Sequence, residues 1–305
     1  MSTISKQKKI YKVTNWPTYN KGLVNRGNLL IMIDFDNLHT LWYAEPEGTE
    51  GAQRIYSDHA IEICLTIGAL CNLPLRQTQG CVKGIFSMMG LPHDVPDYTT
   101  LSKRGDYHSV KIKTQKKDAV VLQVDSTGLK LFGEGEWKVR KHGYTKRRSW
   151  KKLHVGIDTD GEIRSVVVTE NDVHDSAVTE DLFVPEMTGF GGDGAYDTKE
   201  IYEMLLYKGL TDIRIPPRRN AKPWEGEHLR NDYIKAIEET SRKQWKESIG
   251  YHDRSHVEVT MFCYKTAFTD RLKARKDGTQ ETEIKVRCTL LNKMKEVAWA
   301  QYEVT

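Results

Sequence analysis

The sequence predicts an α+β protein in which a helical region precedes a sheet flanked by helices. Helical periodicity and capping residues dominate residues 1 to about 115, whereas short β-branched runs replace them from about residue 118. Two of these runs, 153–157 and 163–168, are joined by an Asp-Gly turn, which is a strong hairpin signal. We therefore expect two regions, 1–115 and 116–305, with a small insertion at about 216–250 in the second.

The composition is that of a globular protein. The 305 residues include 29% charged and 38% hydrophobic side chains, which argues against a disordered chain. No run of about 20 apolar residues could span a membrane, and the polar N-terminus lacks an apolar signal core, so we expect a cytoplasmic protein. The five cysteines form no CxxC pair, so we expect neither a zinc site nor disulfides.

The first region is expected to contain three consecutive helices. Ser57 caps the first, a second runs from about 76 to 89 and ends at Gly90, and a short third covers 97–104. The apolar run 29–33 fits either a strand or a buried helix. Helix, break, helix, turn and helix are compatible with a small DNA-reading module, but a plain helical bundle packed on the second region explains them equally well.

Two acidic residues lie where strands are expected to end. The Val-rich run 119–124 leads to Asp125, and Asp193 stands among glycines where the backbone could approach a ligand closely. Asp197 then has the position of the N-cap of a helix running to about Lys208. Carboxylates that converge from strand ends and a helix can bind hard cations such as Mg²⁺, which prefers oxygen ligands.

A third acid belongs to a mixed stripe near the C-terminus. Four residues at helical offsets of three, seven and fourteen share one face: Tyr251, Arg254, Glu258 and Lys265. Two cations and a phenol suit a phosphodiester, and the carboxylate suits a metal. A separate apolar stripe predicts a core contact: Val257, Met261, Tyr264 and Phe268. An amphipathic helix with a solvated charged face is the alternative explanation of the charged residues.

These segments resemble the bacterial insertion-sequence transposases of the DDE type. The resemblance rests on VDSTGLKLFGEGEWKVRKHG around Asp125, GGDGAYD around Asp193 and YHDRSHVE ending at Glu258. The spacing of the mixed stripe matches the YREK signature of that group, and the sequence around Asp125 is most similar to insertion-sequence family 5. The resemblance extends from TNWPTYNKGLVNRG near the N-terminus to VRCTLLNKMKEVA near the C-terminus.

The resemblance implies a fold and a mechanism. The fold is RNase H-like, with one acid on the first strand, one just after the fourth and one on a late helix. Asp125, Asp193 and Glu258 would be the catalytic residues and would hold two Mg²⁺ ions, for which Mn²⁺ can substitute. Tyr251, Arg254 and Lys265 would grip the phosphates and end nucleotides of the element.

The resemblance also implies a bacterial cytoplasmic protein that associates with the nucleoid, and its implied partners are DNA and a second copy of the chain. The protein would bind terminal inverted repeats as a homodimer in a synaptic complex, cleave the 3′ ends by hydrolysis and join them to target DNA. A nuclease of the same fold that cuts without joining is one alternative. A non-enzymatic DNA-binding regulator derived from a transposase is another, although such a protein need not keep all three acids.

Two further segments are candidate DNA contacts. The stretch 138–152 is basic, holds no acid and interleaves aromatic residues, so it suits a phosphate backbone, although a solvated face is the alternative. Its candidate contacts are Lys138, Arg140, Lys141, Arg147, Arg148, Lys151 and Lys152. In the insertion, Trp245 among basic residues could stack on a displaced base, or it could be a core residue of a solvated loop. His174-Asp175 has the position of a helix cap, and the resemblance leaves open a supporting role near the site.

Overall fold

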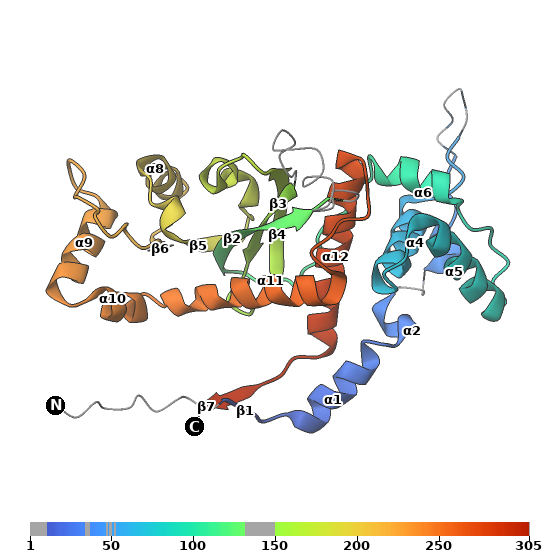
Figure 1. Ribbon diagram of the computed structural model, residues 1–305, viewed down its shortest axis with the longest axis horizontal. Coiled ribbons are helices and arrows are strands. Elements are labelled where there is room, and N and C mark those ends of the chain that lie inside the picture. The colour runs from blue at the N-terminus through green and yellow to red at the C-terminus, as the bar shows by residue number, and fades with distance from the viewer. Residues whose placement is uncertain are drawn as a thin grey trace, which may run out of the picture.

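A mixed sheet forms the centre of the molecule (Figure 1). The structure is a computed structural model that describes residues 11–33, 37–46, 48, 51, 53–131 and 150–304. Within them the sheet has five strands in the order β4-β3-β2-β5-β6: β2 (Val120–Lys130), β3 (Trp150–Ile157), β4 (Ile163–Glu170), β5 (Met187–Gly191) and β6 (Asp212–Arg214). The first three strands are antiparallel, and β5 and β6 run parallel to β2. This arrangement confirms the expected RNase H-like sheet and its Asp-Gly hairpin.

Helices cover both faces of the sheet. On one face, Leu122 and Phe190 pack with Tyr202 of α8 (Lys199–Tyr207) in one hydrophobic core. On the other face, β3 packs against α11 (Ser255–Phe268) in a second core. The predicted apolar stripe of α11 is buried there as expected: Val257, Met261, Tyr264 and Phe268. The sheet thus holds α11 against β2, where the first acid lies.

The N-terminal region is helical, as predicted. Its helices are α1 (Trp16–Asn25), α2 (Leu29–Met32), α3 (Leu38–Leu41), α4 (Asp58–Leu70), α5 (Leu75–Met88) and α6 (Tyr98–Gly105). The Ser57 side chain caps α4 by accepting from the Ala60 N–H at 3.0 Å, and Asp97 caps α6. Gly90, with φ +65°, follows the end of α5. The ambiguous run 29–33 is therefore a short helix followed by one extended residue.

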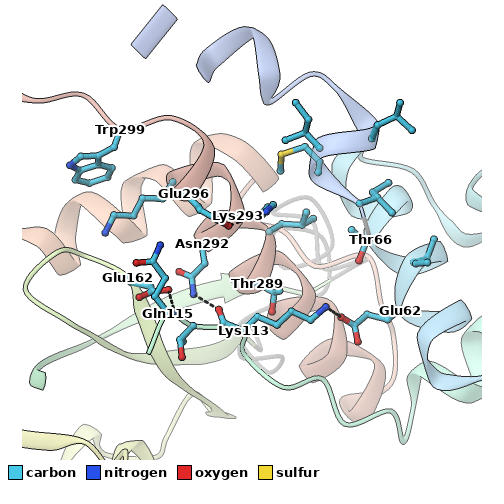
Figure 2. A pocket seen from close by; sticks show the side chains of 18 of the residues that line it. Glu62, Thr66, Lys113, Gln115, Glu162, Thr289, Asn292, Lys293, Glu296 and Trp299 are labelled. Carbon is cyan, nitrogen blue, oxygen red and sulfur yellow. Dashed lines mark hydrogen bonds and ion pairs between the residues drawn. The ribbon is translucent and has the colours of Figure 1, made fainter. Parts of the chain in front are cut away.

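The long helix α12 (Asp277–Val297) lies between the sheet and the N-terminal helices (Figure 1). Ile284 and Leu290 of α12 share one hydrophobic core with Ile61 of α4 and Leu153 of β3. A polar cavity of about 790 Å³ remains at this junction (Figure 2), where the Lys113 ammonium lies 3.6 Å from the Glu62 carboxylate. The division of the chain at 115/116 stays a prediction.

The remaining elements connect these layers. Short 3₁₀ turns η1 (Asp175–Val178) and η2 (Glu180–Leu182) link β4 to β5, and η3 (Gly194–Tyr196) follows β5. The segment 216–250 contains α9 (Leu229–Glu239) and α10 (Arg242–Ser248), and η4 (Tyr251–Arg254) leads from there into α11. Strands β1 (Tyr11–Val13) and β7 (Tyr302–Val304) pair antiparallel near the two ends of the chain. Among the helices described, none has both the length and the apolar character needed to cross a bilayer.

Several sequence expectations were wrong in detail. Strand β2 continues past Asp125 to Lys130, because its second half pairs with β3. The N-cap of α8 is Thr198, since the Asp197 carboxylate is instead buried in a salt bridge with Arg230, at 2.5 Å. The helix expected from about Asp175 is a pair of 3₁₀ turns, and residues 251–254 are 3₁₀ rather than α-helical.

Candidate active site

Asp125 lies in the middle of β2, on the sheet face that α11 covers. Its Oδ1 accepts a hydrogen bond from the Ser126 N–H at 2.8 Å, and its side chain is about four-fifths buried, with 21% exposure. The alternation of β2 points Asp125 and Thr127 to the same face. Both side chains therefore reach the edge of α11.

Asp193 reaches the same place from the neighbouring strand. Because β2 and β5 are parallel with Gln123 opposite Gly191, Asp125 and Asp193 both lie two residues beyond a paired position. Asp193 caps η3, its Oδ1 accepting from the Ala195 N–H at 2.8 Å. A Cβ at Gly192 would overlap the Tyr196 ring, so this close turn requires glycine.

Glu258 completes the group from the first turn of α11. Arg254 lies between two of the acids: its Nη2 is 2.8 Å from Asp125 Oδ2 and its Nη1 is 3.0 Å from Glu258 Oε1. The Glu258 side chain is 62% exposed, so this carboxylate is open to solvent and to a ligand. The guanidinium thus holds a strand acid and a helix acid side by side.

The acids repel one another. Burial raises the pKa of Asp125, and the nearby carboxylates of Asp193 and Glu258 raise it further. The Ser126 N–H and the Arg254 guanidinium act in the opposite direction without cancelling this increase. The site therefore carries excess negative charge that a cation would stabilise.

The turn η4 and the far end of α11 bring the other stripe residues to β2. Lys265 Nζ donates to Thr127 Oγ1 at 2.6 Å. Burial raises the pKa of Tyr251, whose ring lies 4.4 Å from the Lys246 ammonium. Gly250, with φ +65°, lets the chain turn from α10 into η4. Arg254 and Lys265 thus both contact the strand that carries Asp125.

Comparison with known protein families agrees with this geometry. A family model described as Transposase DDE domain matches residues 116–293, more than half of the chain, and a second one with the same description matches residues 24–134. The chain belongs to the DDE transposase family. This membership confirms the resemblance to insertion-sequence transposases, while the assignment to insertion-sequence family 5 and the YREK signature stay predictions.

The transposase engages some of its expected DNA contacts internally. Lys151 is 8% exposed and pairs with Glu170 and Asp277, and Lys152 pairs with Asp175 at 2.8 Å. The other candidate contacts of the basic segment lie outside the described residues: Lys138, Arg140, Lys141, Arg147 and Arg148.

The expectation that Trp245 stacks on a base was wrong. Its side chain is only 3% exposed and packs against the Tyr233 ring, with 5.1 Å between the ring centroids. The core alternative holds, because α9 and α10 fold the insertion around this indole instead of presenting it to solvent.

Sequence reasoning missed a buried cluster behind the acids of the transposase. The Tyr196 hydroxyl is buried without a hydrogen-bond partner. Burial raises the pKa of Tyr196, and the carboxylates of Asp175, Asp125 and Asp193 add to the increase. His154 lies 3.5 Å from Asp175, which is therefore part of this cluster instead of a side-chain cap. The motif GGDGAYD contains Tyr196, but only the fold shows that its ring turns back under the acids.

DDE transposases use divalent metal ions, and the residues of this site fit such ions chemically. Within the described residues, no three or more His, Cys, Asp or Glu side chains are already gathered around one ion position, and Arg254 stands against two of the acids. However, carboxylate oxygens are the ligands that Mg²⁺ prefers, and burial together with the neighbouring carboxylates raises the pKa of Asp125. The donor set fits a divalent ion once Arg254 moves away from Asp125 and Glu258.

Proposed function

We propose that this transposase binds the terminal inverted repeats of an insertion sequence, hydrolyses the phosphodiester at each 3′ end and joins that end to target DNA. The observation that carries the proposal is the convergence of Asp125, Asp193 and Glu258 beside β2, with Arg254 and Lys265 on the same edge. Acids from three elements meet cations there, as cleavage of a polyanion requires.

The acids are the proposed ligands of two Mg²⁺ ions, with Mn²⁺ as a substitute. Bound ions would activate the attacking water or 3′-hydroxyl and stabilise the leaving oxygen. Asp125 lies within β2 and Asp193 follows β5 by two residues, whereas Glu258 lies in the first turn of a helix and is 62% exposed, so Glu258 has the most freedom to adjust to a ligand. No covalent protein–DNA intermediate is needed.

Arg254, Lys265 and Tyr251 are the proposed phosphate contacts. Arg254 would exchange its carboxylate partners for a DNA phosphate when ions take over the acids, because the same guanidinium geometry serves both anions. The hydrogen-bond partner of Lys265 among the described residues is a neutral hydroxyl on β2, so a phosphate offers it a stronger partner. Cutting two ends together implies a homodimer in the synaptic complex.

The test uses DNA that borders the gene, labelled at one end, incubated with protein and Mg²⁺. Asp125→Asn, Asp193→Asn and Glu258→Gln are each expected to lower cleavage by about 10³-fold or more while the protein still binds the repeat. Glu281→Gln is the matched control for Glu258→Gln, because Glu281 is also a helical glutamate paired at i,i+4. Residual cleavage above a few per cent in the acid variants would contradict the assignment.

The products separate the proposal from its alternatives. Nicked ends that are never joined to target DNA would identify a nuclease. Binding of the repeats without any cleavage by the wild-type protein would identify a regulator.

A further inference from the structure

An exposed phenylalanine stands in the row of charged residues on α11. Four of the five phenylalanines in the described residues are buried or half-buried: Phe86, Phe183, Phe190 and Phe268. Phe262 is the exception, with 70% of its surface exposed. The apolar stripe that packs α11 on the sheet is complete without it, so the fold does not explain this ring.

Helix geometry places Phe262 next to the site. It follows Glu258 by four residues and precedes Lys265 by three, and such neighbours lie on the same face of a helix. With a rise of about 1.5 Å per residue, its Cα stands roughly 6 Å along the axis from Glu258 and roughly 4.5 Å from Lys265. Since Lys265 contacts β2 directly, the ring flanks the same edge on its solvent side.

One flank of the ring is charged, and Val259, an apolar residue that is 51% exposed, lies three residues before Phe262 on the helix. A partner that covers Phe262 would also meet the Glu258 carboxylate and the Lys265 ammonium, and a purely apolar surface would have to desolvate both groups. A nucleotide suits both the ring and the cation beside it, because its base offers a flat apolar face to Phe262 and its phosphate offers a negative charge to Lys265. Aromatic rings beside cations are the usual platforms for unpaired bases.

We propose that Phe262 is a stacking platform for an unpaired nucleobase at the DNA end, on the nucleotide whose phosphate Arg254 and Lys265 contact. The inference rests on the proposed function and adds a residue to it. Phe262 is a specificity-determining residue: it favours ends whose terminal base is out of the duplex. A stacked base also fixes the position of the adjoining phosphate beside the acids.

The experiment measures binding without divalent ions to three duplexes of the bordering DNA. The first is fully paired, the second has one unpaired 2-aminopurine at the end, and the third has an abasic residue there. Phe262→Ala should weaken binding of the unpaired end by roughly 5- to 150-fold, the range for one stacked base, and should abolish the fluorescence quenching of 2-aminopurine. Phe262→Trp should restore both.

A matched control variant makes the test specific, and so does the comparison of wild type and Phe262→Ala on DNA with and without the terminal base. Tyr207→Ala removes an aromatic side chain that is 92% exposed on α8, away from α11, and should bind all three duplexes like the wild type. On the abasic end, wild type and Phe262→Ala should have equal affinity. Equal losses on every duplex, or quenching that persists in Phe262→Ala, would overturn the stacking role.

Other outcomes have assigned meanings. If Phe262→Ala changes the sedimentation of the protein without DNA and leaves DNA affinity alone, the ring belongs to an interface between copies, and the stacking role is wrong. If the wild type binds none of the duplexes, the proposed function fails as well. If the wild type binds and cleaves, and Phe262→Ala is indistinguishable from it, only this inference fails.

Discussion

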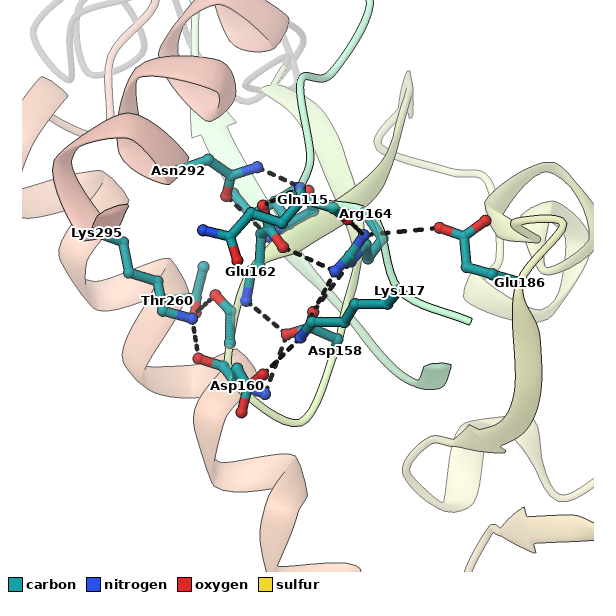
Figure 3. A network of polar contacts seen from close by, with 12 residues as sticks. Gln115, Lys117, Asp158, Asp160, Glu162, Arg164, Glu186, Thr260, Asn292 and Lys295 are labelled. Carbon is teal, nitrogen blue, oxygen red and sulfur yellow. Dashed lines mark hydrogen bonds and ion pairs between the residues drawn. The ribbon is translucent and has the colours of Figure 1, made fainter. Parts of the chain in front are cut away.

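Two groups of acidic residues beside the same sheet differ in how far cations balance their negative charge. At the hairpin turn between β3 and β4, Asp158 is enclosed by cations (Figure 3). Beside β2, Asp125 shares the Arg254 guanidinium with Glu258 and faces a third acid, Asp193. Burial raises the pKa of both aspartates, yet the net shift is upward for Asp125 and downward for Asp158, because their charged partners differ.

At the hairpin, cations and N–H groups match the carboxylates. Burial alone would raise the pKa of Asp158, but Lys117, the Glu162 N–H and Arg164 lower it overall. Arg164 is 1% exposed and contacts Asp158 at 2.9 Å and Glu162 at 2.8 Å. The cations and N–H groups of this network together favour an ionised Asp158 in the folded protein, so we assign the network a structural role.

At the β2 edge, the acids exceed their partners. Ser126 and Arg254 do not offset burial and the two neighbouring carboxylates, and the pKa of Asp125 stays raised. A fold that keeps such repulsion is less stable than it would be with a neutral residue there. The comparison supports the proposal that the unmatched acids are the functional group and that the matched acids belong to the scaffold.

The largest expected contrast is in activity. Asp125→Asn should lower DNA cleavage by about 10³-fold or more, because an amide cannot replace a carboxylate ligand. Asp158→Asn should keep cleavage within about 10-fold of wild type when it is assayed well below its melting temperature, since the partners of Asp158 in the described part of the chain belong to the hairpin network. Cleavage rates on one labelled end measure both. Comparable losses in the two variants would break the distinction between the groups.

The next contrast is in stability, where substitutions in the hairpin network should have larger effects than substitutions in the Asp125 group. Arg164→Met should lower the free energy of unfolding by about 3–5 kcal/mol, because it removes the buried guanidinium that Asp158 and Glu162 share. Lys199→Met is the matched control, because the exposed pair of Lys199 with Glu203 should contribute at most about 0.5 kcal/mol. Urea titrations at pH 7 provide the measurement.

Asp125→Asn should raise the free energy of unfolding. A carboxyl group whose folded pKa is raised stabilises the fold only when protonated, and that contribution is lost as the pH rises through the folded pKa. At pH 7 the ionised Asp125 therefore costs stability that asparagine restores. A loss as large as that of Arg164→Met would show that the Asp125 group is structural too.

A divalent ion should sharpen the comparison further. Mg²⁺ at about 100 times its dissociation constant should stabilise the wild type by about 2.7 kcal/mol. The same Mg²⁺ concentration should stabilise Asp125→Asn and Asp193→Asn less than the wild type. It should stabilise Asp158→Asn as much as the wild type, when each protein is compared with itself in the absence of Mg²⁺. Thermal melts with and without Mg²⁺ at constant ionic strength test this. An equal shift in all variants would place ion binding elsewhere.

The smallest expected effect concerns His154, behind the acids. Burial lowers the pKa of His154, and Lys152 lowers it further, while Asp175 acts in the opposite direction. We take the ring to be neutral, because Lys152 already pairs with Asp175 at 2.8 Å and the histidine side chain is fully buried.

A lowered histidine pKa makes stability depend on pH below neutrality. Its contribution is complete above the unfolded pKa of about 6.5 and is lost as the pH falls towards the folded pKa. His154→Gln keeps a partner for Thr169 and should flatten the slope of the unfolding free energy between pH 7 and 5, by at most about 1.4 kcal/mol per pH unit. Identical slopes in variant and wild type would mean that folding does not shift the pKa of His154.

The sequence alone determined the local elements and the identity of the acids. Periodicity and capping located α4, α5 and α6, and the Asp-Gly turn located the β3–β4 hairpin, because these signals arise between residues close in the chain. Asp125, Asp193 and Glu258 were also found from motifs, although their catalytic roles stay proposals. The apolar stripe of α11 followed from spacing alone.

Only the tertiary structure decided which charges are matched. Trp245 and Lys151 are residue types that often contact DNA. Long-range packing, however, buries Trp245 and pairs Lys151 with acids from β4 and α12. Arg254 contacts Asp125 across 129 residues of sequence, and no local pattern encodes that pairing. The physical reason is that propensities act over a few residues, whereas burial and charge balance depend on neighbours that only the folded chain brings together.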